Sequence, residues 1–192
     1  MTFIISLDPA QLRDWSALAV IDMQYRPDTR RFGYSLVAMA RKQGLPYDQI
    51  VDWVSRVYHK PEFNYKQPPE LVVDSTGVGV AVVDMLHTKG LRLNAVTITA
   101  GESFSQQGSI FHVGKARLIG TFLGAFDGGK VQVNPNMPIW PQLEKEMLSY
   151  RAEISAQGRA KFEAEEGEHD DMIFALAQAI WFGEEAKRGK RL

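Results

Sequence analysis

The sequence predicts an α/β domain with a mixed central sheet, and three observations support this prediction. Short apolar runs of strand length alternate with longer stretches whose apolar residues recur at helical spacing. The first three runs follow one another through tight connections, which predicts an antiparallel meander. Residues 71–99 then follow the order strand, turn, helix, strand, which is typical of a parallel βαβ unit. We therefore expect a three-layer domain with helices on both faces of the sheet and with its first three strands antiparallel.

The bulk composition is that of an ordinary globular protein. The 192 residues are 45% hydrophobic and 23% charged, enough for one domain with a proper core, and we expect a single domain over 1–192 with 186–192 as a flexible tail. The formal net charge is -1, so a DNA-binding surface would have to be local. The chain has no cysteine, which excludes disulfides, thiolate metal sites and a cysteine nucleophile. No apolar run is long enough to span a membrane, and no phosphate-binding P-loop is present.

The first half of the chain supplies the meander and the βαβ unit. We expect strands at 3–8, 16–23 and 31–39, a helix from Pro46 to about Tyr58, a strand at 71–74, a helix at 80–89 and a strand at 95–99. The second half is less regular. We expect a surface loop at 99–108, a helix at 115–126, a short edge strand at 130–133, a helix from Pro138 or Pro141 to about residue 148, a hairpin formed by 150–154 and 159–163, and a last helix beginning near His169.

Carboxylates stand at the ends of two predicted strands and at the start of the last predicted helix. Asp8 and Asp74 each end an apolar strand, and Asp170 and Asp171 open the last helix. Ligands of open α/β sheets gather at the carboxyl ends of strands, so these side chains can converge. For any one strand-end Asp a turn or cap role is the commoner one, but several together favour a metal site.

Convergent carboxylates repel one another, and divalent cations relieve the repulsion; all-oxygen ligands suit Mg²⁺ or Mn²⁺. Two such ions can activate a water and stabilise the leaving oxygen of a phosphodiester, which makes a nuclease the leading hypothesis. Adjacent helix residues point about 100° apart, so only one of Asp170 and Asp171 need face the ions, and we favour Asp171.

Three motifs, in order, carry a resemblance to a known family. They are Leu7-Asp8-Pro9-Ala10 with Asp14-x-Ser16-Ala17, then Val73-Asp74-Ser75-Thr76-Gly77-Val78-Gly79, then His169-Asp170-Asp171-Met172-Ile173 with Ala175-Leu176-Ala177. Together they resemble the C-terminal nuclease domain of tailed-bacteriophage large terminase subunits, a RuvC-like member of the ribonuclease H fold. The resemblance covers nearly all of the chain.

This resemblance implies a metal-dependent endonuclease that cuts double-stranded DNA during phage genome packaging. It implies that Asp8, Asp74 and one or both of Asp170 and Asp171 hold two Mg²⁺ or Mn²⁺ ions, with Asp8, Asp74 and Asp171 catalytic. The family's whole protein also has an N-terminal ATPase domain, with the portal and the small terminase as expected partners. This chain has no P-loop and resembles an excised domain, acting in the cytoplasm of the infected bacterial host without a membrane partner.

Six further residues are candidates for contact with phosphate or DNA. His169 is placed to orient a carboxylate or touch a phosphate, although a plain helix-start role is as good an explanation. Lys115 and Arg117 open a predicted helix where the family tends to have a basic residue, and a solvated helix end is the alternative. The predicted hairpin carries Arg151, Arg159 and Lys161, interleaved with glutamates that weaken the patch.

Two other functions compete with the terminase nuclease. A RuvC-like junction resolvase or transposase-type nuclease would use the same fold and would cut branched DNA selectively. A non-catalytic module that docks on DNA or on the portal is a hypothesis of another class. Negative charge at the centre of the surface argues against that module, because phosphate would be repelled there.

Overall fold

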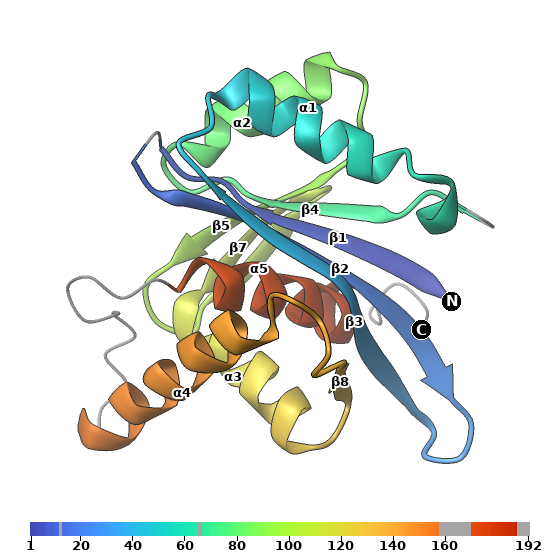
Figure 1. Ribbon diagram of the computed structural model, residues 1–192, viewed down its shortest axis with the longest axis vertical. Coiled ribbons are helices and arrows are strands. Elements are labelled where there is room, and N and C mark those ends of the chain that lie inside the picture. The colour runs from blue at the N-terminus through green and yellow to red at the C-terminus, as the bar shows by residue number, and fades with distance from the viewer. Residues whose placement is uncertain (12, 65–66, 158–169, 188–192) are drawn as a thin grey trace.

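The computed structural model describes residues 1–11, 13–64, 67–157 and 170–187. Within these ranges an eight-stranded mixed sheet forms the middle layer of the domain (Figure 1). Its spatial order is β6-β7-β5-β4-β1-β2-β3-β8. The strands are β1 Thr2–Asp8, β2 Trp15–Arg26, β3 Arg31–Gln43, β4 Glu70–Asp74, β5 Asn94–Thr99, β6 Phe104–Gln107, β7 Ile110–Gly114 and β8 Val131–Val133.

Helices cover both faces of this sheet, as expected (Figure 1). One face carries α1 (Tyr47–Tyr58) and α2 (Gly79–Thr88), with the short 3₁₀ helix η1 (Pro61–Phe63) following α1. The other face carries α3 (Lys115–Asp127), α4 (Trp140–Gln157) and α5 (Asp171–Trp181), which continues into the π-helix η2 (Phe182–Lys187). The predicted three-layer α/β architecture is therefore confirmed.

The strand directions bring the carboxyl ends of several strands to one edge of the sheet. β1, β2 and β3 form the predicted antiparallel meander. β1 runs parallel to β4, β4 to β5, and β5 to β7. The carboxyl ends of these four parallel strands consequently lie along the same edge, and Asp8 and Asp74 are the last residues of two adjacent strands.

The alternation of side chains along β1 and β2 separates two apolar cores. Ile5 and Leu7 pack with α1 and α2 on one face. Ile4 and Ala17 pack with α3, α4 and α5 on the other face. Every residue of α5 after Asp171 is buried, so this helix lies in the middle of its layer and covers β1 and β2. Apart from Gln178, the residues of α5 after Asp171 are accordingly apolar on all sides of the helix.

Two sequence-based predictions are wrong. The stretch 99–108 is not only a loop, because β6 lies within it and pairs antiparallel with β7. All four residues of β6 are exposed, so this edge strand lacks the apolar alternation that reveals a strand. The predicted strand 150–154 belongs instead to α4, which extends to Gln157; the predicted partner strand 159–163 lies outside the described residues. Leu143, Met147 and Tyr150 are buried at helical spacing in α4.

The remaining boundaries agree closely with expectation. α4 begins at Trp140, one residue before Pro141, and β8 is a short edge strand beside β3. α5 begins at Asp171, two residues after the expected start. Ala186 and Lys187, the first residues of the expected tail, belong to η2, and 188–192 lie outside the described residues. Among the described residues, no helix is long and apolar enough to cross a bilayer.

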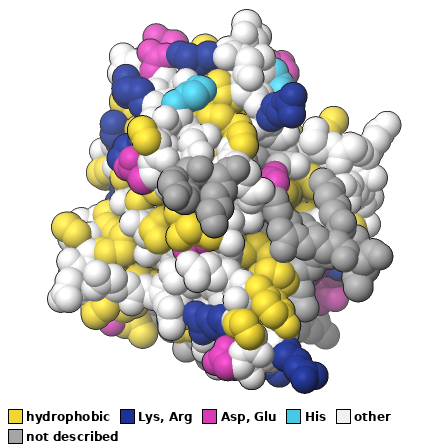
Figure 2. Space-filling view, turned by 90° about the vertical axis from the view of Figure 1, so that its right-hand side faces the viewer, with side chains coloured by type: hydrophobic (Ala, Val, Ile, Leu, Met, Phe, Trp, Pro, Cys, Tyr) yellow, Lys and Arg dark blue, Asp and Glu magenta, His cyan; other side chains and the backbone are white. Residues whose placement is uncertain are grey.

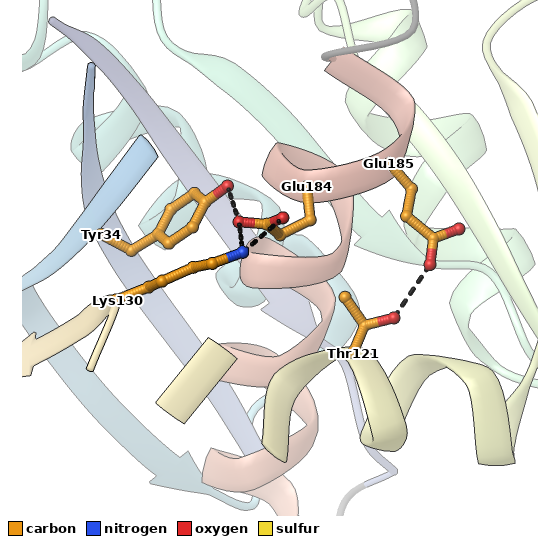
Figure 3. Close-up of polar contacts among 5 residues, drawn as sticks. All are labelled: Tyr34, Thr121, Lys130, Glu184 and Glu185. Atoms are coloured by element: carbon orange, nitrogen blue, oxygen red, sulfur yellow. Dashed lines mark hydrogen bonds and ion pairs between the residues drawn. The ribbon is translucent and has the colours of Figure 1, made fainter. Parts of the chain in front are cut away.

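The C-terminal end of α5 is fixed by two acidic residues of η2 (Figure 3). Lys130 Nζ lies 3.0 Å from both carboxylate oxygens of Glu184, and Tyr34 Oη donates to Glu184 at 2.8 Å. Glu185 accepts from Thr121 at 2.9 Å and from Arg117 at 2.7 Å. These contacts attach η2 to β3, to the turn before β8 and to α3.

Candidate metal-binding active site

Asp8 is placed by the two strands that flank β1. Asp8 pairs with Ala17 of β2, and its neighbour Leu7 pairs with Val73 of β4. Leu7 faces α1 and α2, so the pleat turns Asp8 toward the face that α5 covers. Pro9 follows immediately and ends the strand.

Asp74 ends β4 beside Asp8, and a close backbone approach fixes the turn that follows it. A Cβ atom on Gly79 would lie 2.0 Å from the carbonyl oxygen of Asp74 and 3.4 Å from Pro9. Only glycine therefore allows α2 to begin this close to the ends of β4 and β1. Within the turn, the backbone N–H of Thr76 donates to Asp74 Oδ1 at 2.7 Å, which orients this carboxylate.

α5 brings Asp170 and Asp171 to the same edge. Asp170 is the N-cap of α5 and Asp171 its first residue. Further along the helix, Gln178 Nε2 donates to Ser6 Oγ at 3.1 Å, and both side chains are buried. Ser6 and Asp8 share one face of β1, so this hydrogen bond fixes how far along β1 the helix lies. It thereby sets the height of the two helix carboxylates relative to Asp8.

The electrostatics of Asp8 show that these carboxylates act on one another. Burial raises the pKa of Asp8 well above its usual range. The negative charges that raise it further are those of Asp74, Asp171, Asp170 and Glu146, in decreasing order of effect. Burial also raises the pKa of Asp74, against the lowering effect of its hydrogen bonds from Thr76. The structure thus brings Asp74, Asp170 and Asp171 into electrostatic range of Asp8.

Glu146 is a fifth carboxylate at this place, and the sequence analysis missed it. It lies on α4, is 8% exposed, and pairs with Arg41 at 2.9 Å. Burial raises its pKa to about 7; Asp171 raises it too, and Arg41 lowers it. One signal was available: Glu146 lies on the stripe of Leu143, Met147 and Tyr150, and an acid within a buried stripe indicates a partner. The helix was expected to end at about residue 148, which assigned Tyr150 to a strand and left only part of this stripe in view.

The donor set fits a hard divalent cation. Asp8, Asp74, Asp170 and Asp171 offer only carboxylate oxygens, which suit Mg²⁺ or Mn²⁺. In the described part of the chain, no three acidic or histidine side chains are already gathered closely enough to hold an ion. Binding would therefore draw the carboxylates together and offset the repulsion that raises the pKa of Asp8.

The residues predicted to contact phosphate or DNA lie in different parts of the structure. Lys115 lies at the start of α3 with its Nζ 4.8 Å from the ring centre of Phe174, one turn after Asp170 on α5. Arg117 is engaged by Glu185 and lies over Phe104 at 4.9 Å. Arg151 lies within α4. His169, Arg159 and Lys161 lie outside the described residues.

The opposite end of the sheet has a mixed surface. Figure 2 shows the side of the molecule where β1 begins, away from Asp8. Basic and acidic side chains are interspersed among the residues coloured there, and neither sign forms one broad patch. Of the two candidate DNA contacts whose side chains the structure describes, Lys115 lies next to the first turn of α5, whereas Arg117 pairs with Glu185 at the other end of that helical segment.

Comparisons with known proteins support the fold. No protein-family model matches the sequence, and no curated protein gives a significant match. The crystal structure of the large terminase nuclease from thermophilic phage G20c with bound magnesium superposes with a TM-score of 0.65 at 21% identity, covering 93% of this chain and 80% of that chain. Thermus thermophilus RuvC (TM-score 0.47, 13% identity, 98% and 97% covered) and the manganese-soaked human cytomegalovirus terminase nuclease domain (TM-score 0.49, 12% identity, 97% and 85% covered) are more distant. The chain has the ribonuclease H-like fold of a phage large terminase nuclease, as the sequence motifs predicted.

Proposed function

We propose that this chain is a metal-dependent endonuclease that cuts double-stranded DNA during the packaging of a phage genome. The observation that carries the proposal is the convergence of acidic residues from β1, β4 and α5 at one edge of the sheet. Asp8 is its centre, because burial and the neighbouring carboxylates together raise the pKa of this side chain. The fold of a magnesium-bound terminase nuclease supports the same conclusion.

The proposed roles follow from the positions of the residues. Asp8, Asp74 and Asp171 are the catalytic ligands of two Mg²⁺ or Mn²⁺ ions, and Asp170 is an additional ligand. When bound, such ions lower the pKa of the attacking water and stabilise the departing oxygen of the phosphodiester. Thr76 keeps the Asp74 carboxylate oriented toward the site through its backbone N–H. Lys115 supplies a positive charge next to the first turn of α5, where it can contact a DNA phosphate.

The setting of the reaction belongs to the same proposal. The chain would act as one domain beside an ATPase motor in the cytoplasm of the infected bacterial host, with the portal and the small terminase as partners. The net charge of -1 gives the isolated domain little long-range attraction for DNA. We therefore expect weak, salt-sensitive DNA binding that the rest of the packaging machinery reinforces.

Plasmid cleavage by the purified chain tests the proposal. Supercoiled DNA is incubated with Mg²⁺, Mn²⁺, Ca²⁺ or EDTA, alongside Asp8→Asn, Asp74→Asn and the control Asp84→Asn, whose side chain is exposed on α2. Cleavage with Mg²⁺ or Mn²⁺ that disappears in EDTA and in the first two variants, but persists in the control, is the expected result. Full cleavage by Asp8→Asn would contradict the proposed site.

A branched substrate separates this function from its nearest competitor. A terminase nuclease should cut linear and supercoiled duplex with little sequence preference. Strong preference for a four-way junction would instead identify a junction resolvase. DNA binding without cleavage under every ion, by a folded chain, would favour a docking module.

A further inference from the structure

The first turn of α5 is capped in an unusual way. The N–H groups at the start of a helix lack intrahelical partners, and the N-cap side chain commonly accepts from the second or third residue. In α5 these residues are Met172 and Ile173, yet the N-cap residue Asp170 makes no side-chain capping hydrogen bond.

Glu146 of α4 accepts the hydrogen bonds that Asp170 does not. Its Oε2 accepts from the backbone N–H of Met172 at 3.2 Å, and the backbone N–H of Ile173 also donates to its carboxylate. The helix therefore receives its cap from a residue 26 positions earlier in the chain.

Arg41 holds the other oxygen of the same carboxylate. Its Nη1 lies 2.9 Å from Glu146 Oε1, and its guanidinium lies over the ring of Trp15 at 4.5 Å. Arg41 pairs with Ala17 on β2, and Ala17 pairs with Asp8 on β1. The ion pair therefore originates about 10 Å from Asp8, two strand spacings across the same face. It connects the sheet, α4 and the first turn of α5.

We propose that Glu146 is a positioning residue that caps α5 from α4 and thereby holds the first turn of the helix, with Asp170 and Asp171, at the level of Asp8 and Asp74. This inference rests on the proposed function, since it assigns the two aspartates to metal ions. Both oxygens of Glu146 already accept hydrogen bonds, one from Arg41 and one from the helix N–H groups, which favours a positioning role over direct ligation.

The choice of a carboxylate supports this role. Another negative charge at this place is unfavourable, because Glu146 adds to the charges that raise the pKa of Asp8. A glutamine would avoid that repulsion, but Arg41 and the helix donate to different oxygens of Glu146, and in glutamine one of these two positions is an NH₂ donor. A carboxylate presents a separate acceptor oxygen to each donor.

Variants of Glu146 test the cap without reference to catalysis. In the metal-free chain, amide hydrogen exchange at Met172 and Ile173 should be roughly fivefold faster in Glu146→Ala, the effect of losing an ordinary cap. Glu146→Gln keeps one acceptor and should lie between the alanine variant and the wild type. Glu184→Gln serves as the matched control, because it removes a mostly buried acid in η2, beyond the other end of α5. Unchanged exchange in Glu146→Ala would overturn the cap.

Titration with Mn²⁺, followed by electron paramagnetic resonance, tests the positioning role. Glu146→Ala should raise the dissociation constant for Mn²⁺ on the order of 10-fold, as is typical when an outer partner of a metal ligand is lost. Glu146→Gln should recover part of this loss, and Glu184→Gln should leave the constant unchanged. Equal losses for Gln and Ala would identify Glu146 as a ligand, and an unchanged constant in both would leave it a structural residue; either result overturns the proposal.

The two measurements also separate this inference from the function on which it rests. A wild-type chain that binds no Mn²⁺ and cuts no DNA would contradict the proposed nuclease and, with it, the positioning role. Amide exchange in Glu146→Ala would still decide whether Glu146 caps the helix.

Discussion

The two ends of the helical segment formed by α5 and η2 each carry a pair of adjacent acids, but in opposite surroundings. At the C-terminal end, Glu184 meets Lys130 and Glu185 meets Arg117. At the N-terminal end, Asp170 and Asp171 raise the pKa of Asp8 together with two more carboxylates. The first arrangement lowers electrostatic energy within the protein. The second raises it, which is typical of groups kept for a ligand rather than for stability.

The largest expected difference between the ends concerns DNA cleavage. Asp171→Asn removes a charged ligand and should reduce the cleavage rate by on the order of 1000-fold, as expected when several kcal/mol of metal-ion stabilisation are lost. Glu184→Gln should cut at the wild-type rate below its melting temperature. Plasmid cleavage time courses at saturating Mn²⁺ measure both. Equal activity of the two variants would remove the functional distinction between the ends.

Stability should respond in the opposite sense. Glu184→Gln leaves Lys130 without its ion-pair partner, and the side chains of this pair are only 23% and 10% exposed. Removing one partner of such a pair costs about 3 kcal/mol. Glu185→Gln, whose partner Arg117 is 38% exposed, should cost under about 1 kcal/mol. Chemical denaturation measures both losses, and Asp171→Asn should match or exceed the wild type because it relieves repulsion.

The pH dependence of the free energy of unfolding, measured without metal, also distinguishes the N-terminal end of α5 from the C-terminal end of η2. Because the pKa of Glu146 rises from 4.5 to about 7 on folding, the folded protein holds a proton that the unfolded chain has released. The free energy of unfolding should therefore fall as the pH rises through this interval, by about 2 kcal/mol from this group. The raised pKa of Asp8 acts in the same direction.

Denaturation in EDTA at pH 5 and pH 8 measures this loss. Glu146→Gln should show a smaller difference between the two pH values, whereas Glu185→Gln should not change it. Addition of Mg²⁺ should recover stability mainly at pH 8, where the carboxylates are ionised and can bind it. A metal-free stability that rose between the two pH values in the wild type relative to Glu146→Gln would contradict the assignment.

The sequence predicted the strand-end acids far better than the contacts that hold them. Asp8 and Asp74 could be predicted because a strand end is encoded locally, by an apolar run followed by a turn. Glu146 was not, because its partners Arg41 and Met172 are distant in sequence and meet only through the sheet order. The edge strand β6 was missed for a related reason, since its four exposed residues carry no buried pattern. Local periodicity gives elements, whereas long-range polar pairs require the fold.

The smallest expected effect tests what keeps α5 in register between its two ends. Gln178→Met removes the donor to Ser6 and leaves a buried hydroxyl unsatisfied, at a cost of about 1 kcal/mol. Ser6→Ala combined with Gln178→Met should recover most of that stability, because both polar groups are then gone. If the hydrogen bond also sets the height of Asp171 beside Asp8, cleavage should stay reduced in the double variant although its stability is restored. Wild-type cleavage by this double variant would show that apolar packing alone positions the helix.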